Sequence, residues 1–327
     1  SVDLRVIALG SDRALFDSGS SAHARALAYA HAFGELHVIV FALRSEHLEP
    51  LHADPLFVYP TRSYSRLLYA LDAARLAMKI GGDAITTQDP FESGWASARA
   101  ARSLGIPLHI QLHTDPFARA FARASFLNRL RLIIMPFVIR HAARIRVVSK
   151  HLKEELEQRY HPNAAITVLP IYTDLARFRN MYREPEKGRL LWIGRFEYEK
   201  DPMLALETLA ALRAAGVDAH LTMLGSGRLL RAVKARAKAR GLTSHVEFPG
   251  HADPLPYLAR AELVLATSRY EGYGLSIVEA LAAGVPVLST DVGIAREAGA
   301  GVAPRGECIQ KAVELLKEGP PRPAGRG

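Results

Sequence analysis

The stretch RYEGYGLSIVEALAAGVPV, residues 269–287, joins a predicted strand to a predicted helix through a loop that contains two glycines. The preceding ELVLATS, residues 262–268, is largely apolar, which is typical of a strand buried on both faces in a parallel sheet. Apolar residues at helical spacing in LSIVEALAAG, residues 275–284, predict a helix packed against that sheet. A strand, loop and helix in this order predict an α/β fold that binds its ligands at the carboxyl ends of the strands.

The same alternation of strand and helix repeats along the chain, which predicts parallel sheets covered by helices. Apolar periodicity fades before RLLWIG, residues 189–194, where a second series of strands and helices begins. We therefore predict two doubly wound, Rossmann-like domains that face each other across a cleft. The predicted parts are an N-terminal domain, a linker, a C-terminal domain and a disordered tail, at residues 1–175, 176–188, 189–318 and 319–327.

The start of the helix at 275–284 has the features of an anion-binding site. Gly272 and Gly274 allow the backbone to approach a ligand closely. The amides of Leu275 and Ser276 lack partners within the helix and carry the positive end of its dipole. These features predict that the helix start binds a diphosphate.

Two acids flank this helix start, Glu271 in the loop and Glu279 inside the helix. Neither is well explained as a neighbour of phosphate, because all three groups are anionic. A carboxylate can accept hydrogen bonds from two hydroxyl groups at once. Glu279 is therefore predicted to bind a neutral diol such as a ribose, and Glu271 a sugar hydroxyl.

The loop that follows the predicted strand at 189–194 contains two cations, Arg195 and Lys200. A loop at the carboxyl end of this strand faces the same ligand, and the two cations complement a diphosphate. The alternative is that they pair with Glu197 and Glu199 on a solvated loop.

GRFEYEKD at 194–201, followed by SRYEGYGLSIVEALAAGVPVLSTDVG at 268–293, resembles the C-terminal domain of family 4 glycosyltransferases, retaining enzymes of the GT-B fold. The resemblance covers most of residues 189–297. The N-terminal half resembles the family more weakly, in HIQLHTD at 109–115 and ITVLPIYTDLARF at 166–178.

The resemblance implies roles for individual residues. Arg195 and Lys200 would hold the donor diphosphate, Glu279 the ribose, and Glu271 the transferred sugar. His113 would approach that sugar from the N-terminal, acceptor-side domain, and Gly19 would lie beside the phosphate. The catalytic set is then Glu271, His113, Arg195 and Lys200, and the donor-binding set is Arg195, Lys200, Glu279, Gly272, Gly274, Leu275, Ser276 and Gly19.

The implied reaction transfers a sugar, with anomeric retention, from a UDP-, GDP- or ADP-sugar to an acceptor hydroxyl of a glycan or lipid-linked substrate. It needs no metal and no cofactor. A sugar-nucleotide epimerase of the same fold and a catalytically silent binding protein remain alternatives. A nicotinamide-dependent dehydrogenase is disfavoured, because LGSGRL at 224–229 is followed by Leu230 where the dinucleotide fingerprint has a glycine.

The composition, 49% hydrophobic and 23% charged, is that of a globular protein. A lone cysteine, Cys308, and the absence of a leader pattern predict a cytoplasmic location. The net charge of +9 is concentrated in residues 116–153, which contain no acid. This segment is either a solvated basic face or a peripheral contact with an anionic membrane. No nucleic-acid motif appears, so we do not expect nucleic acid as a partner.

Overall fold

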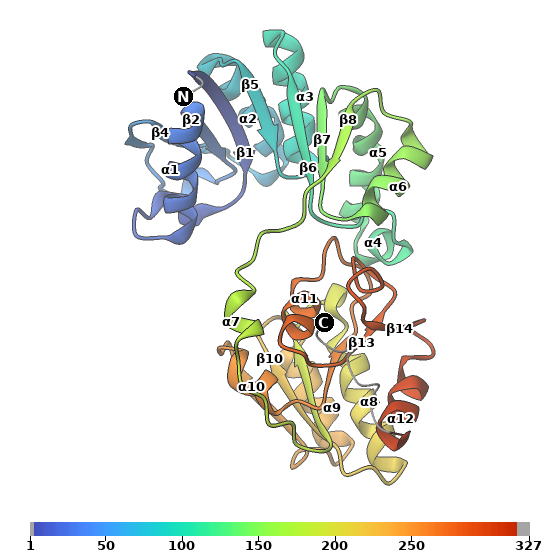
Figure 1. The fold of residues 1–327 in the computed structure, drawn as a ribbon. Coiled ribbons are helices and arrows are strands. Elements are labelled where there is room, and N and C mark those ends of the chain that lie inside the picture. The colour runs from blue at the N-terminus through green and yellow to red at the C-terminus, as the bar shows by residue number, and fades with distance from the viewer. Residues whose placement is uncertain (1–2, 319–327) are drawn as a thin grey trace. The chain divides into compact units, whose positions relative to one another are not determined.

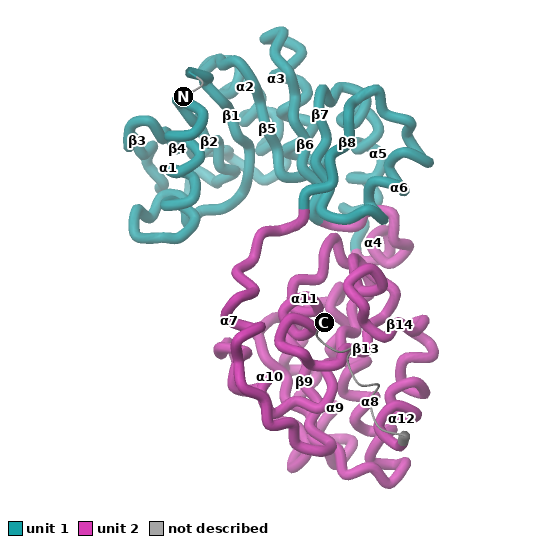
Figure 2. The backbone as a smooth tube through the Cα atoms, in the orientation of Figure 1, with its two compact units in different colours: residues 1–113, 125–169 teal, residues 114–124, 170–327 magenta. Residues whose placement is uncertain are grey.

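The computed structural model describes residues 3–318 and divides into two compact units (Figures 1 and 2). The first unit comprises residues 1–113 and 125–169, and the second comprises 114–124 and 170–327. The domains predicted from the sequence differ from these units: residues 114–124 and 170–175 were assigned to the N-terminal domain, 176–188 to a linker, and the C-terminal domain began at 189. The tail at 319–327, predicted to be disordered, lies outside the described residues.

The first unit is built on an eight-stranded sheet with the order β3-β4-β2-β1-β5-β6-β7-β8 (Figure 1). All neighbouring strands are parallel except the pair β3 and β4, which is antiparallel. The strands are β1 Leu4–Gly10, β2 Gly34–Val40, β3 Leu51–Ala53, β4 Leu56–Pro60, β5 Ala84–Thr87, β6 Leu108–Leu112, β7 Arg144–Val147 and β8 Ala165–Val168.

Alternate residues of β1 face two different helix layers. Ile7 and Leu9 are buried against the cluster formed with α2, α3 and α5, whereas Val6 is buried against α1. Burial on both faces explains why these strands are apolar without interruption. The helices are α1 Ser21–Phe33, α2 Tyr69–Ile80, α3 Glu92–Leu104, α5 Phe126–Arg140 and α6 Lys150–Tyr160, with 3-10 turns η1 Arg13–Phe16, η2 Arg44–Glu46 and η3 Arg66–Leu68.

The second unit contains a six-stranded parallel sheet with the order β11-β10-β9-β12-β13-β14. The chain adds strands outward from β9 in one direction and outward from β12 in the other. The boundary between β9 and β12 is therefore the switch point, where ligands of doubly wound sheets bind. The strands are β9 Arg189–Ile193, β10 His220–Leu224, β11 Val246–Gly250, β12 Leu263–Ala266, β13 Val287–Thr290 and β14 Gly301–Ala303.

Helices cover both faces of this second sheet. One buried cluster joins it to α8, α9 and α12, and the other joins it to α7, α10 and α11. The helices are α4 Arg119–Ala124, α7 Ala176–Arg179, α8 Pro202–Ala214, α9 Leu230–Ala239, α10 Leu255–Arg260, α11 Leu275–Ala282 and α12 Cys308–Glu318, with the 3-10 turn η4 Tyr198–Lys200. Within residues 3–318, no helix has the length and apolar character needed to cross a bilayer.

Candidate active site

The loops that follow β9 and β12 are tied together at the switch point of the second unit. Trp192 is fully buried in β9, and its indole Nε1 donates to Thr267 Oγ1 at 2.9 Å. The Thr267 hydroxyl lies 3.0 Å from the carbonyl oxygen of Lys200 and 2.9 Å from that of Asp201, both of which accept from it. Sequence reasoning missed Thr267, whose role appears only when the two strands are adjacent.

Lys200 and Glu271 form an ion pair across this junction. Lys200 Nζ donates to Glu271 Oε1, and Ser268 Oγ donates to the same oxygen at 2.8 Å. Only 19% of the Lys200 side chain and 14% of the Glu271 side chain are exposed, so solvent screens this pair little. The structure thus brings together two residues for which the family resemblance implies separate roles.

Arg195 instead pairs with Glu199 at 2.6 Å, with 73% of its side chain exposed. Arg195 thus adopts the alternative arrangement, in which the cation pairs with a neighbouring glutamate on a solvated loop. Glu197 binds neither of the two predicted cations but accepts from Arg228 Nε at 2.9 Å. That hydrogen bond lowers the pKa of Glu197, and the nearby charges of Arg228 and Arg195 add to the effect.

Helix α11 begins after a glycine, and among the described residues two amides of its first turn have no acceptor. Gly274 is the N-cap residue, with φ at +98°, and supplies no side chain to cap the helix. Within the described residues, no acceptor bonds the amides of Leu275 and Ser276. The loop before the helix packs against Gly293. A side chain at this position would collide with the carbonyl oxygen of Tyr273, so the close approach requires a glycine. Two donors at the positive end of a helix therefore face outward together.

Glu279 lies in α11 and is partly buried, and within residues 3–318 its carboxylate accepts no hydrogen bond from another residue. Burial raises the pKa of its carboxyl, and the positive charge of Arg177 partly opposes that rise. Arg177 itself bonds Asp253 Oδ1 at 2.6 Å. Because no protein group donates to this carboxylate, its oxygens are available to accept from a ligand hydroxyl group.

Gly272 is buried in the loop between the two acids. The remaining predicted site residues, His113 and Gly19, belong to the first unit. His113 directly follows β6, its Nε2 lies 3.3 Å from Gln111 Oε1, and burial lowers its pKa, which favours the neutral imidazole at pH 7. The amide of Gly19, the residue predicted to lie beside the phosphate, donates to Asp17 Oδ1 within its own loop at 2.9 Å.

No group of three or more potential metal ligands lies together among residues 3–318.

Models of two glycosyltransferase domains match most of the chain. The model described as Glycosyltransferase Family 4 matches residues 18–177, and the one described as Glycosyl transferases group 1 matches residues 187–318. Together with the two doubly wound sheets and the open helix start at the switch point, these matches define the class. The chain belongs to the GT-B glycosyltransferases.

Individual relatives are more distant. Glycogen synthase of Mycobacterium tuberculosis is 29% identical over 227 residues, covering 66% of this chain and 55% of the relative. The GDP-mannose-dependent alpha-(1-6)-phosphatidylinositol dimannoside mannosyltransferase of the same species is 33% identical over 156 residues, covering 45% of this chain and 40% of the relative. The chain thus spans about half the length of the curated relatives it matches.

Solved structures share the fold at low sequence identity. Sucrose-phosphate synthase from Thermosynechococcus elongatus superposes with a TM-score of 0.72 at 19% identity, over 97% of this chain and 90% of that structure. Anabaena HepE in complex with UDP and glucose gives a TM-score of 0.66 at 16% identity, over 96% of this chain and 90% of that structure. These likenesses confirm the predicted GT-B architecture of two Rossmann-like α/β domains.

Proposed function

We propose that this protein is a retaining, metal-independent glycosyltransferase of family 4, which transfers a sugar from a UDP-, GDP- or ADP-sugar to an acceptor hydroxyl. The observation that carries the proposal is that α11 contains both features. Its first two amides have no acceptor, and the carboxylate of Glu279, which is half-buried, has no hydrogen-bond donor. Open amides suit a diphosphate, and the isolated carboxylate suits the hydroxyl groups of a ribose.

The other predicted residues take roles around that site. Lys200 and Arg195 stabilise the negative charge that grows on the leaving nucleotide diphosphate, as a metal would elsewhere. Lys200 already bonds Glu271, so its position is fixed before the donor arrives. Glu271 accepts from a hydroxyl of the transferred sugar, and neutral His113 of the N-terminal domain serves the same sugar.

Gly272 keeps the loop close to the ligand in this arrangement. The Gly19 loop contacts phosphate only after its amide is released from Asp17.

The relatives support this choice of donor and acceptor class. The mannosyltransferase relative is described as GDP-mannose-dependent, and HepE is described in complex with UDP. We therefore propose a nucleotide-sugar donor and a glycan or lipid-linked acceptor.

A thermal-shift panel of UDP, GDP, ADP and their sugar conjugates tests the proposal. We expect at least one of these ligands to raise the melting temperature of the wild-type protein. The shift should be lost in Glu279→Ala and kept in Glu247→Ala, which removes a carboxylate on β11 that bonds Thr222. Stabilisation by none of the nucleotides would overturn the proposal. Single-turnover product formation with excess acceptor then separates transfer from epimerisation and from silent binding.

We further propose a cytoplasmic location and peripheral contact with an anionic membrane through α5. Phe126 and Ile133 are 72% and 73% exposed on this helix, and Leu127 and Leu130 are exposed beside them. Exposed apolar residues among arginines are typical of interfacial helices. The helix continues through Pro136. Nucleic acid is not expected as a partner.

Co-sedimentation with vesicles that contain phosphatidylglycerol tests this contact. Binding should fall in Phe126→Ser/Ile133→Ser, while binding that is indifferent to the anionic lipid content would refute it.

A further inference from the structure

The second unit contains a cavity of about 420 Å³ next to the candidate active site. All of its lining residues belong to that unit, including part of α4. Four arginines and a single carboxylate contribute to the lining: Arg119, Arg123, Arg269, Arg305 and Asp291. The carboxylate, Asp291, already pairs with Arg296 at 2.8 Å. The cavity is therefore strongly electropositive.

Two of the four arginines are fixed in place by one buried acid. Asp201 is only 2% exposed, and its Oδ2 accepts a hydrogen bond from Arg305 Nε at 2.7 Å and forms an ion pair with Arg269 at 3.0 Å. One carboxylate thus compensates two guanidinium groups. Asp201 holds this position with φ at +45°, a conformation uncommon outside glycine, and its side chain makes no cap to α8.

Arg269 is further oriented by Tyr198, whose ring centroid lies 4.5 Å from the guanidinium carbon. Its Nε is buried and has no hydrogen-bond partner.

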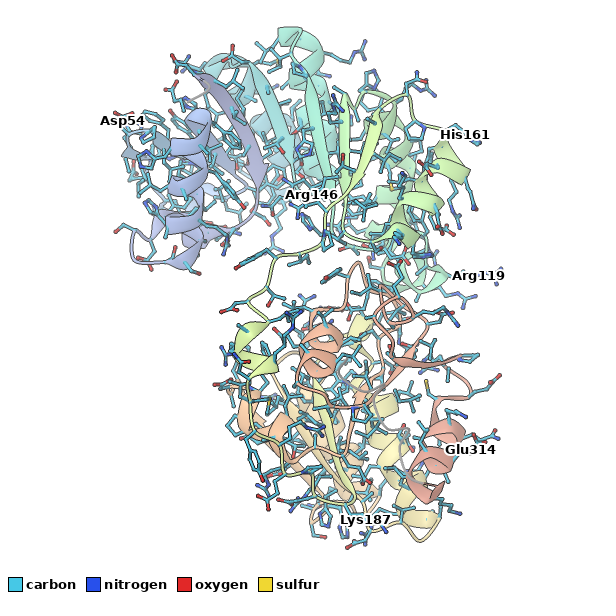
Figure 3. All side chains as sticks on the ribbon, in the orientation of Figure 1. Asp54, Arg119, Arg146, His161, Lys187 and Glu314 are labelled. Atoms are coloured by element: carbon cyan, nitrogen blue, oxygen red, sulfur yellow. The ribbon has the colours of Figure 1, made fainter. Side chains whose placement is uncertain are left out.

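The other two arginines are exposed on α4 and uncompensated; Figure 3 labels Arg119. Within the described part of the chain, neither Arg119 nor Arg123 has a carboxylate partner. Arginine forks bind phosphate oxygens in pairs, and a phosphate offers several oxygens to several forks at once. We propose that this cavity binds a phosphate-bearing ligand.

The cavity adjoins the candidate active site through one side chain. Ser268 lines the cavity and donates to Glu271 at 2.8 Å, the acid proposed to contact the transferred sugar. A phosphate in the cavity is thus close to the reacting groups. Its source is either the acceptor, a role that rests on the proposed function, or a free phosphorylated metabolite that acts as an effector.

Calorimetric titration of the full chain with inorganic phosphate, glucose 6-phosphate and glucose tests the binding. We expect the two phosphates to bind and glucose not to bind. In Arg119→Gln/Arg123→Gln, which changes only exposed side chains, phosphate affinity should fall at least about tenfold, since charge-assisted bonds are lost. The matched control Arg231→Gln, an exposed arginine of α9, should retain wild-type affinity.

The variant Lys200→Gln shows where the phosphate binds, because this substitution would weaken the affinity for inorganic phosphate only if the phosphate bound at the start of α11. The proposal is overturned if neither phosphate binds, if the double variant binds as the wild type does, or if only Lys200→Gln weakens binding. A nucleotide panel run in parallel distinguishes this proposal from the proposed function. If the protein binds phosphate but no nucleotide, only the proposed function fails.

Transfer assays then identify the source. If the acceptor supplies the phosphate, the double variant raises the KM of a phosphorylated acceptor and leaves that of its unphosphorylated form unchanged. If a metabolite supplies it, glucose 6-phosphate changes kcat with an unphosphorylated acceptor, and the double variant abolishes that change. Either result supports phosphate binding in the cavity.

Discussion

Three helices of the first unit begin differently from α11 of the second unit. In the first unit a serine caps α1, α5 and α6, where Ser20, Ser125 and Ser149 accept from amides of the first turn. In the second unit α11 begins at Gly274 and its first amides stay open. A capped start satisfies its own donors and stabilises the fold, whereas an open start at a switch point leaves those donors to a ligand. The contrast separates helix starts that serve stability from one that serves binding.

The largest effect is expected from the cation beside the open helix start. Lys200→Ala should lower kcat/KM for the nucleotide sugar by about 10²–10³-fold, because it removes a preorganised positive charge from the developing anion. Steady-state kinetics check this, with Arg231→Ala as the control for loss of an exposed cation of the same unit. Wild-type kinetics in Lys200→Ala would contradict the assignment of the open start of α11 to donor binding.

The tether between the β9 and β12 loops should matter for stability as well as activity. Thr267→Val keeps the shape of the side chain but leaves the buried Trp192 Nε1 without its acceptor. We expect a loss of about 1–3 kcal/mol in the free energy of unfolding, measured by denaturant titration. Thr267→Ser, which keeps the hydroxyl, is the matched control; equal stability of the two variants would show that the tether is unimportant.

Loss of a serine cap should lower stability without affecting nucleotide binding. Ser149→Ala should lower the free energy of unfolding by about 1 kcal/mol, since one amide of α6 loses its acceptor. Nucleotide affinity should not change. A weaker nucleotide complex in this variant would mean that the capped starts also take part in binding.

The smallest effect concerns pH. Burial raises the pKa of Glu279 in the free protein, and hydroxyl groups bond its ionised form. Nucleotide affinity should therefore decrease as the pH falls through that raised pKa, and Glu279→Gln should lose this part of the dependence.

The raised pKa of Glu279 also makes the stability of the folded state depend on pH. Because the folded state binds the proton of Glu279 more tightly than the unfolded state, this residue favours folding at low pH and loses that contribution as the pH rises through its folded pKa. Glu279→Gln should therefore gain stability over wild type above that pKa, as measured by thermal unfolding across pH. A pH-independent difference would contradict this.

The sequence predicted the sheet framework because central parallel strands are continuous apolar runs, as in β1 and β9. It missed β3 and β14, which have three residues each and lie at the edges of their sheets, and also β4, which has five residues and lies one place in from the edge. Short edge strands contain too few residues for a period to be recognised. The edge strands lie away from the β9–β12 boundary, so missing them did not affect the site prediction.

The individual site residues were predictable, but their partners were not. Glycines and acids around a helix start are visible in the sequence, and the open amides of Leu275 and Ser276 follow from helix geometry. The ion pair of Lys200 with Glu271 joins residues that are 71 positions apart. Only the pairing of β9 with β12 brings these two residues together.

The most direct test of the account uses protein labelled with ¹⁵N-leucine and titrated with UDP, GDP and ADP. Leu275 reports the open start of α11, and Leu152, whose amide bonds Ser149 Oγ at 3.3 Å, reports a capped one. The account predicts that at least one nucleotide shifts the amide resonance of Leu275 and leaves that of Leu152 in place. Nucleotide binding that leaves the Leu275 resonance unchanged would contradict it.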